Sequence, residues 1–315
     1  MASKYVITAC HCTYVYDKRG LGVIGKYGVD GYALGVSIGD HKQDDWNETG
    51  KEKRLKVKSI KRHPEYEKNQ PVPSNNQLNN GYDIAILELY IDVDLTLYTP
   101  ACLAKQTEGT RFNGKRAVAY GWGETANPSP DQPTVNYPME PYELEMRIDS
   151  SSCTDLAEAE KNNNAMIMMA QEPRMMCAGL DIDIDTVQGG ICHVRIVKNI
   201  FLEVLDTVLN ECLSALDYNN YNIYFIQADS GGPFTYRQQN QQHILIGVAS
   251  FARGYRVTRN PNFGNPYISG HQPPVFEDAC GTASYFVRVA LFRDWIDEQL
   301  TGATFCQNNG DADGK

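Results

Sequence analysis

The sequence has no long run of basic residues and no uncharged apolar stretch of the length that a membrane-spanning helix needs. No internal repeat or low-complexity segment stands out. The formal net charge at pH 7 is −10, whereas proteins that follow phosphate backbones carry clustered Lys and Arg side chains. We therefore expect neither a nucleic acid nor a membrane among the partners of this protein.

Spacings typical of a closed zinc site are also missing, although the chain has nine cysteines. So many cysteines are uncommon in a reducing cytosol, so disulfides are the better interpretation, and we expect no metal and no cofactor. The glycosylation sequon Asn47-Glu48-Thr49 agrees with an extracellular protein, although chance in a polar loop explains it equally. The first residues, MASKYVITACHC, lack a secretory leader. Either the protein is not secreted, or the start of its chain is missing from this sequence.

What the sequence does contain is a series of short alternating or apolar runs. Polar stretches rich in Gly and Pro, such as 66–81 and 125–138, separate them. This pattern is typical of an all-β barrel or sandwich protein. The runs cover Lys4–Thr8, Ala33–Ile38, Leu55–Ile60, Ile84–Leu89, Ala117–Trp122 and His243–Phe251.

Two segments depart from the β pattern. LFRDWIDEQL, at 291–300, predicts an ordinary packing helix that ends before Gly302. Its apolar face would carry Phe292, Trp295, Ile296 and Leu300. Within 190–227, apolar residues recur at helical spacing from Val197 to Cys212, so this segment is interpreted as inserted.

Three fragments that are far apart in the sequence carry side chains that complement one another chemically. ITACHC contains His11, GYDIAILEL contains Asp83 and QADSGGPF contains Ser230. A serine hydroxyl is a weak nucleophile and needs a base, for which histidine, with a pKa of about 6.5, is suited. A buried carboxylate then holds the imidazole in the correct tautomer and stabilises its charged form. A structural role is the commoner one for each residue alone, and only their joint occurrence favours catalysis.

These fragments, with two others, resemble the motifs of chymotrypsin-like serine proteases. VITACHC is similar to V-T-A-A-H-C, YDIAIL to D-I-A-L, YGWGET to G-W-G, MMCAG to C-A-G and ADSGGPF to G-D-S-G-G-P, all in the order of the family. The resemblance implies an all-β fold of two antiparallel β-barrels with a C-terminal helix. The expected parts are a first barrel at 1–98, a linker at 99–116, a second barrel with the helix at 117–300, an insert within it at 189–227, and a tail at 301–315.

The resemblance also assigns roles to particular residues. Ser230 would attack the peptide bond, His11 would act as the base and Asp83 would orient His11, so that cleavage passes through an acyl-enzyme. The backbone N–H groups of Ser230 and Ala228 would hold the oxyanion, although most relatives have glycine where Ala228 stands. The implied partners are protein or peptide substrates and protein inhibitors, and the expected state is a monomer.

The residue at the base of the specificity pocket depends on how the insert is aligned. Counting back six residues from Ser230 gives Tyr224, at a position where trypsin-like relatives have Asp. If 189–227 is left out, DTVQ joins ADSGGP and Asp185 takes that position, which would favour Arg or Lys side chains. We prefer the second alignment. The further substrate-binding residues that it implies are Ser250, Phe251 and Ala252.

The resemblance gives a complete disulfide only to Cys153 and Cys177. Cys12 matches a cysteine whose partner in relatives lies upstream of this sequence, and Cys280 matches one whose partner position here holds Val187. Cys102 resembles the linker cysteine that often ties the catalytic domain to a propeptide. No counterpart is assigned to Cys10, Cys192, Cys212 or Cys306.

The insert and the start of the chain each leave alternatives open. Residues 189–227 are either a real loop that packs a helix near the cleft or the translation of a retained intron. The chain begins ten residues before His11 and has no I-V-G-G-like activation site, so the first strands of the first barrel are expected to be missing. Asp229, which in relatives pairs with the freshly cut N-terminus, would then be buried without a partner, at a cost of roughly several kcal/mol if charged.

Two functions fit the sequence. The favoured interpretation is an extracellular serine endopeptidase that cleaves after Arg or Lys, because all three catalytic residue types are present in the expected motifs. The alternative is a non-catalytic serine protease homologue that binds partners in a regulatory cascade. Ala228, the insert and the long segment from Ala252 to Cys280, which could cover the pocket, support the alternative.

Overall fold

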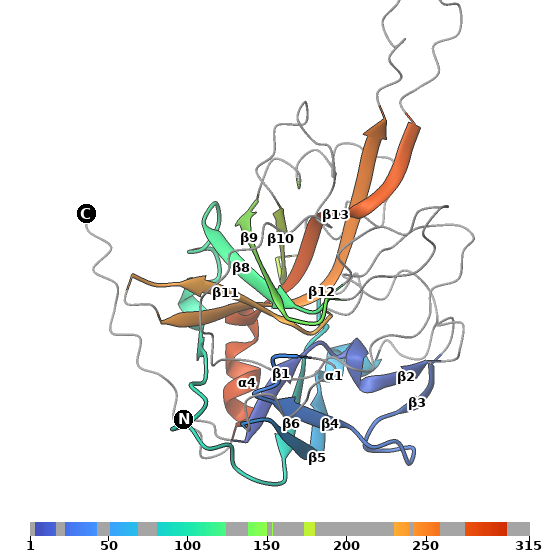
Figure 1. Ribbon diagram of the computed structural model, residues 1–315, viewed down its shortest axis with the longest axis vertical. Coiled ribbons are helices and arrows are strands. Elements are labelled where there is room, and N and C mark those ends of the chain that lie inside the picture. The colour runs from blue at the N-terminus through green and yellow to red at the C-terminus, as the bar shows by residue number, and fades with distance from the viewer. Residues whose placement is uncertain are drawn as a thin grey trace, which may run out of the picture.

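The computed structural model describes residues 4–16, 23–42, 51–68, 81–123, 138–149, 153, 173–179, 230–239, 242–258 and 275–300. At 16, 252–258 and 275–282 it describes the backbone alone. The described residues form two β-structured halves and a short helix near their C-terminal end (Figure 1). The predicted insert 189–227, the tail 301–315 and the sequon at Asn47 lie outside the described residues.

The first half is built on a four-stranded antiparallel sheet in the order β1-β6-β5-β4. Its strands are β1 (Tyr5–Thr8), β4 (Gly35–Ile38), β5 (Lys53–Arg62) and β6 (Ala85–Leu89). A separate hairpin pairs β2 (Tyr14–Tyr16) with β3 (Val23–Lys26), and the helix α1 (Pro64–Lys68) follows β5. Alternate residues of a strand point to the same face of the sheet. One face of this sheet is buried, and its core includes Val36, Leu55 and Leu87.

The second half is a closed barrel of six antiparallel strands. The strands follow the order β11-β8-β9-β10-β13-β12, and β12 pairs back with β11 to close the circle. Their bounds are β8 (Arg116–Gly121), β9 (Tyr142–Ile148), β10 (Met175–Gly179), β11 (Pro233–Arg237), β12 (His243–Thr258) and β13 (Val275–Arg288). The short β7 (Cys102–Leu103) runs parallel to β12. The stacked rings of Phe234 and Phe286, with centroids 4.1 Å apart, lie in the buried core of this half.

An aromatic cluster joins the two halves. His63, between β5 and α1, stacks on Tyr82 with ring centroids 4.9 Å apart. Its ring also contacts Phe292 at 5.3 Å and Trp295 at 4.9 Å, from η5 (Val289–Phe292) and α4 (Arg293–Gln299). Lys61 adds a hydrogen bond of 2.7 Å to the carbonyl of Gln299 at the end of α4. The C-terminal helix therefore fixes β5 of the first half against the second half.

The structure confirms the predicted fold class. Each of the six apolar runs contains a strand, namely β1, β4, β5, β6, β8 and β12. The C-terminal helix is also present, with Phe292, Ile296 and Leu300 buried and Trp295 packed against the core. The described residues of the first half form an open sheet and a hairpin, not a closed barrel.

One disulfide that the resemblance implied is present in the structure. Cys153 and Cys177 form the disulfide that the resemblance implied, with Cα atoms 6.1 Å apart. Cys102 is also disulfide-bonded. Cys10 and Cys12 are both buried thiols beside His11.

Replacing His63 by Phe is expected to remove part of the acid sensitivity of the fold. Burial lowers the pKa of His63 to about 4, whereas the unfolded chain takes up this proton near pH 6.5. The free energy of unfolding therefore falls as the pH drops from the higher value to the lower one, and His63 accounts for about 2 kcal/mol of that fall after allowance for solvent screening.

Urea unfolding at neutral and at mildly acidic pH measures this difference. The exposed His41, replaced by Phe in the same way, serves as the control and should keep the wild-type dependence on pH. An unchanged dependence in His63→Phe would contradict the prediction.

Candidate active site

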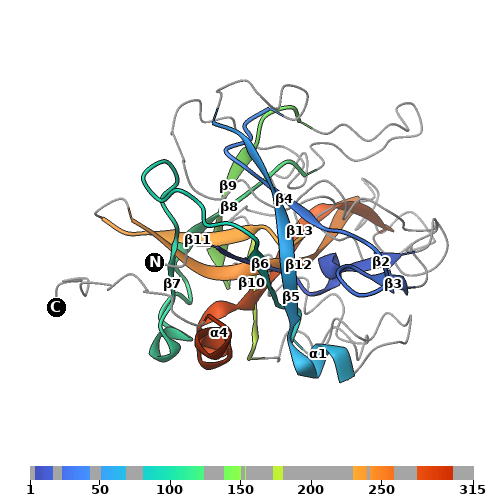
Figure 2. The ribbon, with the colours of Figure 1, turned by 90° about the horizontal axis from the view of Figure 1, so that it is seen from below.

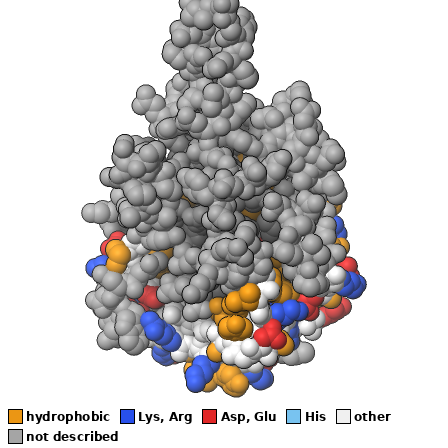
Figure 3. Space-filling view, turned by 90° about the vertical axis from the view of Figure 1, so that its right-hand side faces the viewer, with side chains coloured by type: hydrophobic (Ala, Val, Ile, Leu, Met, Phe, Trp, Pro, Cys, Tyr) orange, Lys and Arg blue, Asp and Glu red, His pale blue; other side chains and the backbone are white. Residues whose placement is uncertain are grey.

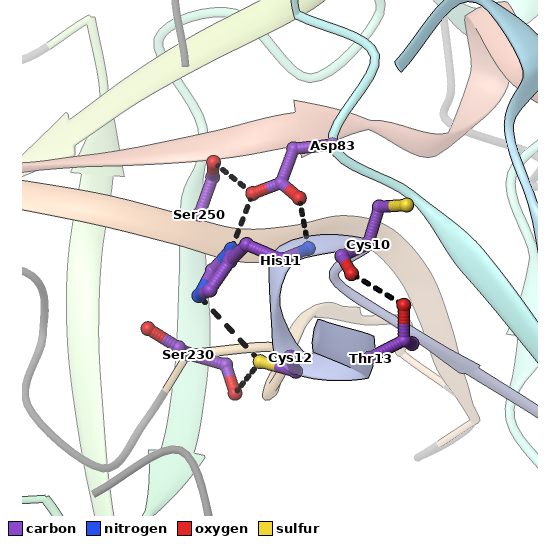
Figure 4. Close-up of polar contacts among 7 residues, drawn as sticks. All are labelled: Cys10, His11, Cys12, Thr13, Asp83, Ser230 and Ser250. Atoms are coloured by element: carbon purple, nitrogen blue, oxygen red, sulfur yellow. Dashed lines mark hydrogen bonds and ion pairs between the residues drawn. The ribbon is translucent and has the colours of Figure 1, made fainter. Parts of the chain in front are cut away.

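His11 and Asp83 lie in direct contact between the two halves (Figure 4). His11 begins the short helix η1 (His11–Thr13) just after β1, and Asp83 lies two residues before β6. The imidazole Nδ1 is 2.6 Å from Asp83 Oδ2, and the backbone N–H of His11 donates to Asp83 Oδ1 at 2.8 Å. Because both the ring and the backbone of His11 are held, the carboxylate fixes the orientation of the imidazole.

Ser250 holds the other side of the same carboxylate. Its hydroxyl donates a hydrogen bond of 2.6 Å to Asp83 Oδ2, and the residue is wholly buried on β12. The sequence predicted Ser250 as a substrate-binding residue but gave no sign of this contact. Nothing in the local sequence GVASF could have indicated it, because its partner lies 167 positions away.

The environment of Asp83 keeps its carboxylate ionised. The side chain is 1% exposed, and burial alone would raise its pKa. The charge of His11 and the hydrogen bonds from His11 and Ser250 outweigh burial, so that the pKa of Asp83 lies below its ordinary value. An ionised carboxylate accepts a hydrogen bond from Nδ1–H, which keeps the proton on Nδ1 and leaves the lone pair of Nε2 able to take a proton from a nucleophile.

Ser230 lies beside the opposite edge of the imidazole (Figure 4). It stands just before β11 and is 4% exposed. The Cys12 sulfur lies 3.5 Å from His11 Nε2 and contacts the backbone oxygen of Ser230 at 3.4 Å. One thiol thus touches both residues, and the three predicted catalytic residues are gathered in one place although they come from distant parts of the chain.

Glycine at position 231 allows this close approach. Gly231 has a φ of 82°, and a Cβ there would overlap with the Thr8 hydroxyl oxygen and lie 3.2 Å from the Ala9 backbone nitrogen. Its own N–H donates to the carbonyl of Ala249 on β12 at 2.8 Å. The turn after Ser230 therefore packs against the end of β1, directly before His11.

The two thiols beside His11 are not suited to act as nucleophiles. Burial, followed by the negative charge of Asp83, raises the pKa of Cys10 well above its ordinary value. A thiol is reactive as its thiolate, and Cys10 therefore stays in the unreactive form. Cys12 is also buried, and its sulfur faces the backbone oxygen of Ser230.

The other predicted site residues are only partly described. Ala228 and Asp185 lie outside the described residues, and Ala252 is described in its backbone alone. Phe251 is wholly buried and stacks on Tyr285, with ring centroids 4.6 Å apart. The predicted contacts of these residues with substrate or oxyanion stay predictions.

In the described part of the chain, no group of three or more His, Cys, Asp or Glu side chains could hold a metal ion. No helix there is long and apolar enough to cross a membrane.

Comparison with protein families gives the family of the chain. The family model described as Trypsin matches residues 1–189. The chain belongs to the trypsin family. Members of this family are serine proteases that act on proteins and are commonly secreted, which supports a serine protease type of function here. A comparison with curated protein sequences found no match.

The match to the trypsin family covers the motifs around His11 and Asp83 and ends at residue 189. That residue is also where the predicted insert begins. The motif around Ser230 lies beyond the matched region, but the structure brings Ser230 next to His11. The bounds of the insert stay a prediction.

Gly231→Ala is expected to destabilise the protein by at least about 3 kcal/mol, because the new Cβ adds a clash with Thr8 to the strain of a positive φ. Gly114 is the matched control, since its φ is 70° and nothing lies within 4 Å of an added Cβ. Gly114→Ala should cost only about 1 kcal/mol. Urea unfolding of both variants separates clash from strain, and equal losses would show that the turn tolerates the methyl group.

Proposed function

We propose that this protein is a serine endopeptidase that hydrolyses peptide bonds through an acyl-enzyme. The contact of His11 with Asp83, with Ser230 beside the opposite edge of the same imidazole, is the observation that carries the proposal. It supplies a nucleophile, a base and a group that orients the base. The surrounding burial strengthens the electrostatic interactions among them.

The first half of the reaction forms the acyl-enzyme. Ser230 Oγ attacks the carbonyl carbon of the substrate while His11 Nε2 takes the hydroxyl proton. Asp83 remains ionised and stabilises the positive imidazole, and the backbone N–H groups of Ser230 and Ala228 stabilise the oxyanion. The C–N bond then breaks as His11 returns the proton to the leaving amine. Water, activated by the same imidazole, hydrolyses the ester and restores Ser230.

We further propose that the enzyme cleaves after Arg or Lys in extracellular proteins. Asp185 supports this preference in the alignment that leaves out 189–227, because a carboxylate at the base of an apolar pocket binds a cationic side chain by a desolvated charge pair. The disulfide between Cys153 and Cys177 supports an oxidising compartment.

One observation favours the second candidate, a non-catalytic homologue that binds partners. The Cys12 sulfur lies 3.5 Å from Nε2, the atom that must accept the proton, and His11 and Ser230 are only 7% and 4% exposed. A site held closed in this way would keep the family fold for recognition without hydrolysis. Labelling of the serine separates the two functions.

A fluorophosphonate probe should label the protein, and Ser230→Ala should abolish the labelling, because only an activated hydroxyl attacks this phosphorus centre. Ser37→Ala, on β4 and away from the site, is the control and should label like the wild type. Absence of labelling in the folded, fully processed protein would support the non-catalytic homologue.

Asp185→Ser should lower kcat/KM for Arg and Lys substrates by at least about 100-fold relative to uncharged ones, because the cation loses its charge partner in the pocket. Peptide substrates that differ only in the residue before the cleaved bond measure this ratio. Tyr224→Ser tests the other alignment in the same assay. An unchanged ratio in Asp185→Ser would rule out the alignment on which Asp185 depends.

A further inference from the structure

The strand β5 carries a charge opposite to that of the whole protein. The net charge of the chain is −10, yet six of the ten residues of β5 are Lys or Arg and none is acidic. A solvated strand needs a few charges on its outer face but not an excess of one sign. The excess of positive charge on β5 therefore indicates that these cations have specific partners.

Two of these cations are used within the fold. Arg62 donates to the Thr13 hydroxyl at 2.7 Å and to the Tyr27 carbonyl at 2.7 Å. Lys61 donates to the carbonyl of Gln299. Both lie at the end of β5 that faces α1 and the second half, and both bind groups of other elements.

The other four cations are exposed at the opposite end of the strand. They are Lys53, Arg54, Lys56 and Lys58. Leu55 points into the core of the sheet, so Arg54 and Lys56 lie on its outer face, about 7 Å apart as alternate residues of one strand. Opposite them on β4 stand Ser37 and Gly35, which bring no charge. Lys4, on the far side of β6, extends the row, and we call these five residues the basic patch.

Nearby carboxylates balance only part of the basic patch. Glu88 lies 2.9 Å from Lys58 Nζ and 3.3 Å from Lys4 Nζ, so one acid serves two lysines. Asp40 and Glu52 interact with each other and Asp40 interacts with Arg54. Asp94 interacts with Lys53, but neither Lys53 nor Lys56 forms a salt bridge among the described residues. The five cations of the patch still outnumber these four carboxylates.

Exposed apolar side chains border the patch. Tyr90 is 65% exposed and Ile91 57% exposed. The N–H of Tyr90 donates to the carbonyl of Lys56 at 3.1 Å, which places Tyr90 directly beside that lysine. Exposed apolar and aromatic groups next to unbalanced cations are typical of protein recognition surfaces.

The basic patch lies on the side of the first half that is away from the second barrel. In Figure 1, β4 and β5 are at the lower end of the molecule, and Figure 2, from below, shows β5 across the front. The lower end also carries the described side chains visible in Figure 3, where Lys, Arg, Asp and Glu lie among hydrophobic groups. A ligand could therefore occupy the patch without entering the site of His11 and Ser230.

We propose that the basic patch is a docking site for an acidic peptide segment of a protein partner, with carboxylates facing Arg54 and Lys56 and an apolar side chain against Tyr90. Carboxylates two residues apart in an extended segment have the same spacing as Arg54 and Lys56. A polysaccharide or nucleic acid fits less well, because Glu88 lies within the patch and the net charge of the chain repels dense polyanions.

Fluorescence anisotropy with a short labelled peptide of the repeat Glu-Ser-Glu-Leu tests the proposal. Ser230→Ala protein is used throughout so that the probe is not cleaved. The double variant Arg54→Glu/Lys56→Glu should bind at least about tenfold more weakly, and added salt should weaken binding to the unaltered patch. Lys115→Glu, an exposed lysine before β8, is the matched control and should bind as before.

A second comparison tests the role of Tyr90. Replacing Leu by Ser in the probe should weaken binding to the intact patch, and this effect should shrink in Tyr90→Ser if the two side chains touch. Thermal unfolding of every variant shows that it is folded before binding is compared.

Three results would overturn the proposal. They are equal binding by the double variant, an equal loss in Lys115→Glu, and a heparin fragment that binds more tightly than the peptide through the same two cations. The last result would assign the patch to a polysaccharide. None of these measurements depends on hydrolysis, so the docking site and the proposed peptidase activity can fail independently.

Discussion

The carboxylate of Asp83 is the group on which the arrangement of the site depends. It is 1% exposed and accepts hydrogen bonds from the backbone and ring of His11 and from the hydroxyl of Ser250. An ionised carboxylate buried without such partners would cost roughly several kcal/mol. The charge therefore penalises any arrangement in which η1 of the first half or β12 of the second half moves away. The same buried carboxylate thus orients His11 and stabilises the contact between the two halves.

The site is a property of the contact between the two halves. His11 and Asp83 come from the first half, whereas Ser230 and Ser250 come from the second. Two further contacts maintain the alignment. Cys12 touches the backbone of Ser230, and the turn at Gly231 packs against the end of β1. At the other side of the interface, His63 and the C-terminal helix form an aromatic contact that does not reach the catalytic groups.

The strands and the motifs of the three candidate catalytic residues could be found in the sequence because both signals are local. An apolar strand such as β6 is evident from its composition, and ADSGGP is specific because small residues and a nucleophile must share one tight turn. Ser250 on Asp83 and Cys12 between His11 and Ser230 could not be predicted, since each contact is made by residues 167 or 218 positions apart. Which strands of the first half pair with one another could not be predicted for the same reason. Alternation indicates a strand but not which strands close into a barrel.

The same alternation explains how one strand serves two purposes. In β5, Leu55 and Ile60 pack toward the core of the sheet, which leaves the intervening cations free to face outward without disturbing that core. At its C-terminal end, β5 donates hydrogen bonds from Lys61 to the carbonyl of Gln299 and from Arg62 to the carbonyl of Tyr27. The bond to Gln299 fixes the strand against the C-terminal helix. A rigid strand loses little conformational entropy when a ligand binds along it. The packing that holds the catalytic residues in place thus also presents a preformed charged row on the outside of the sheet.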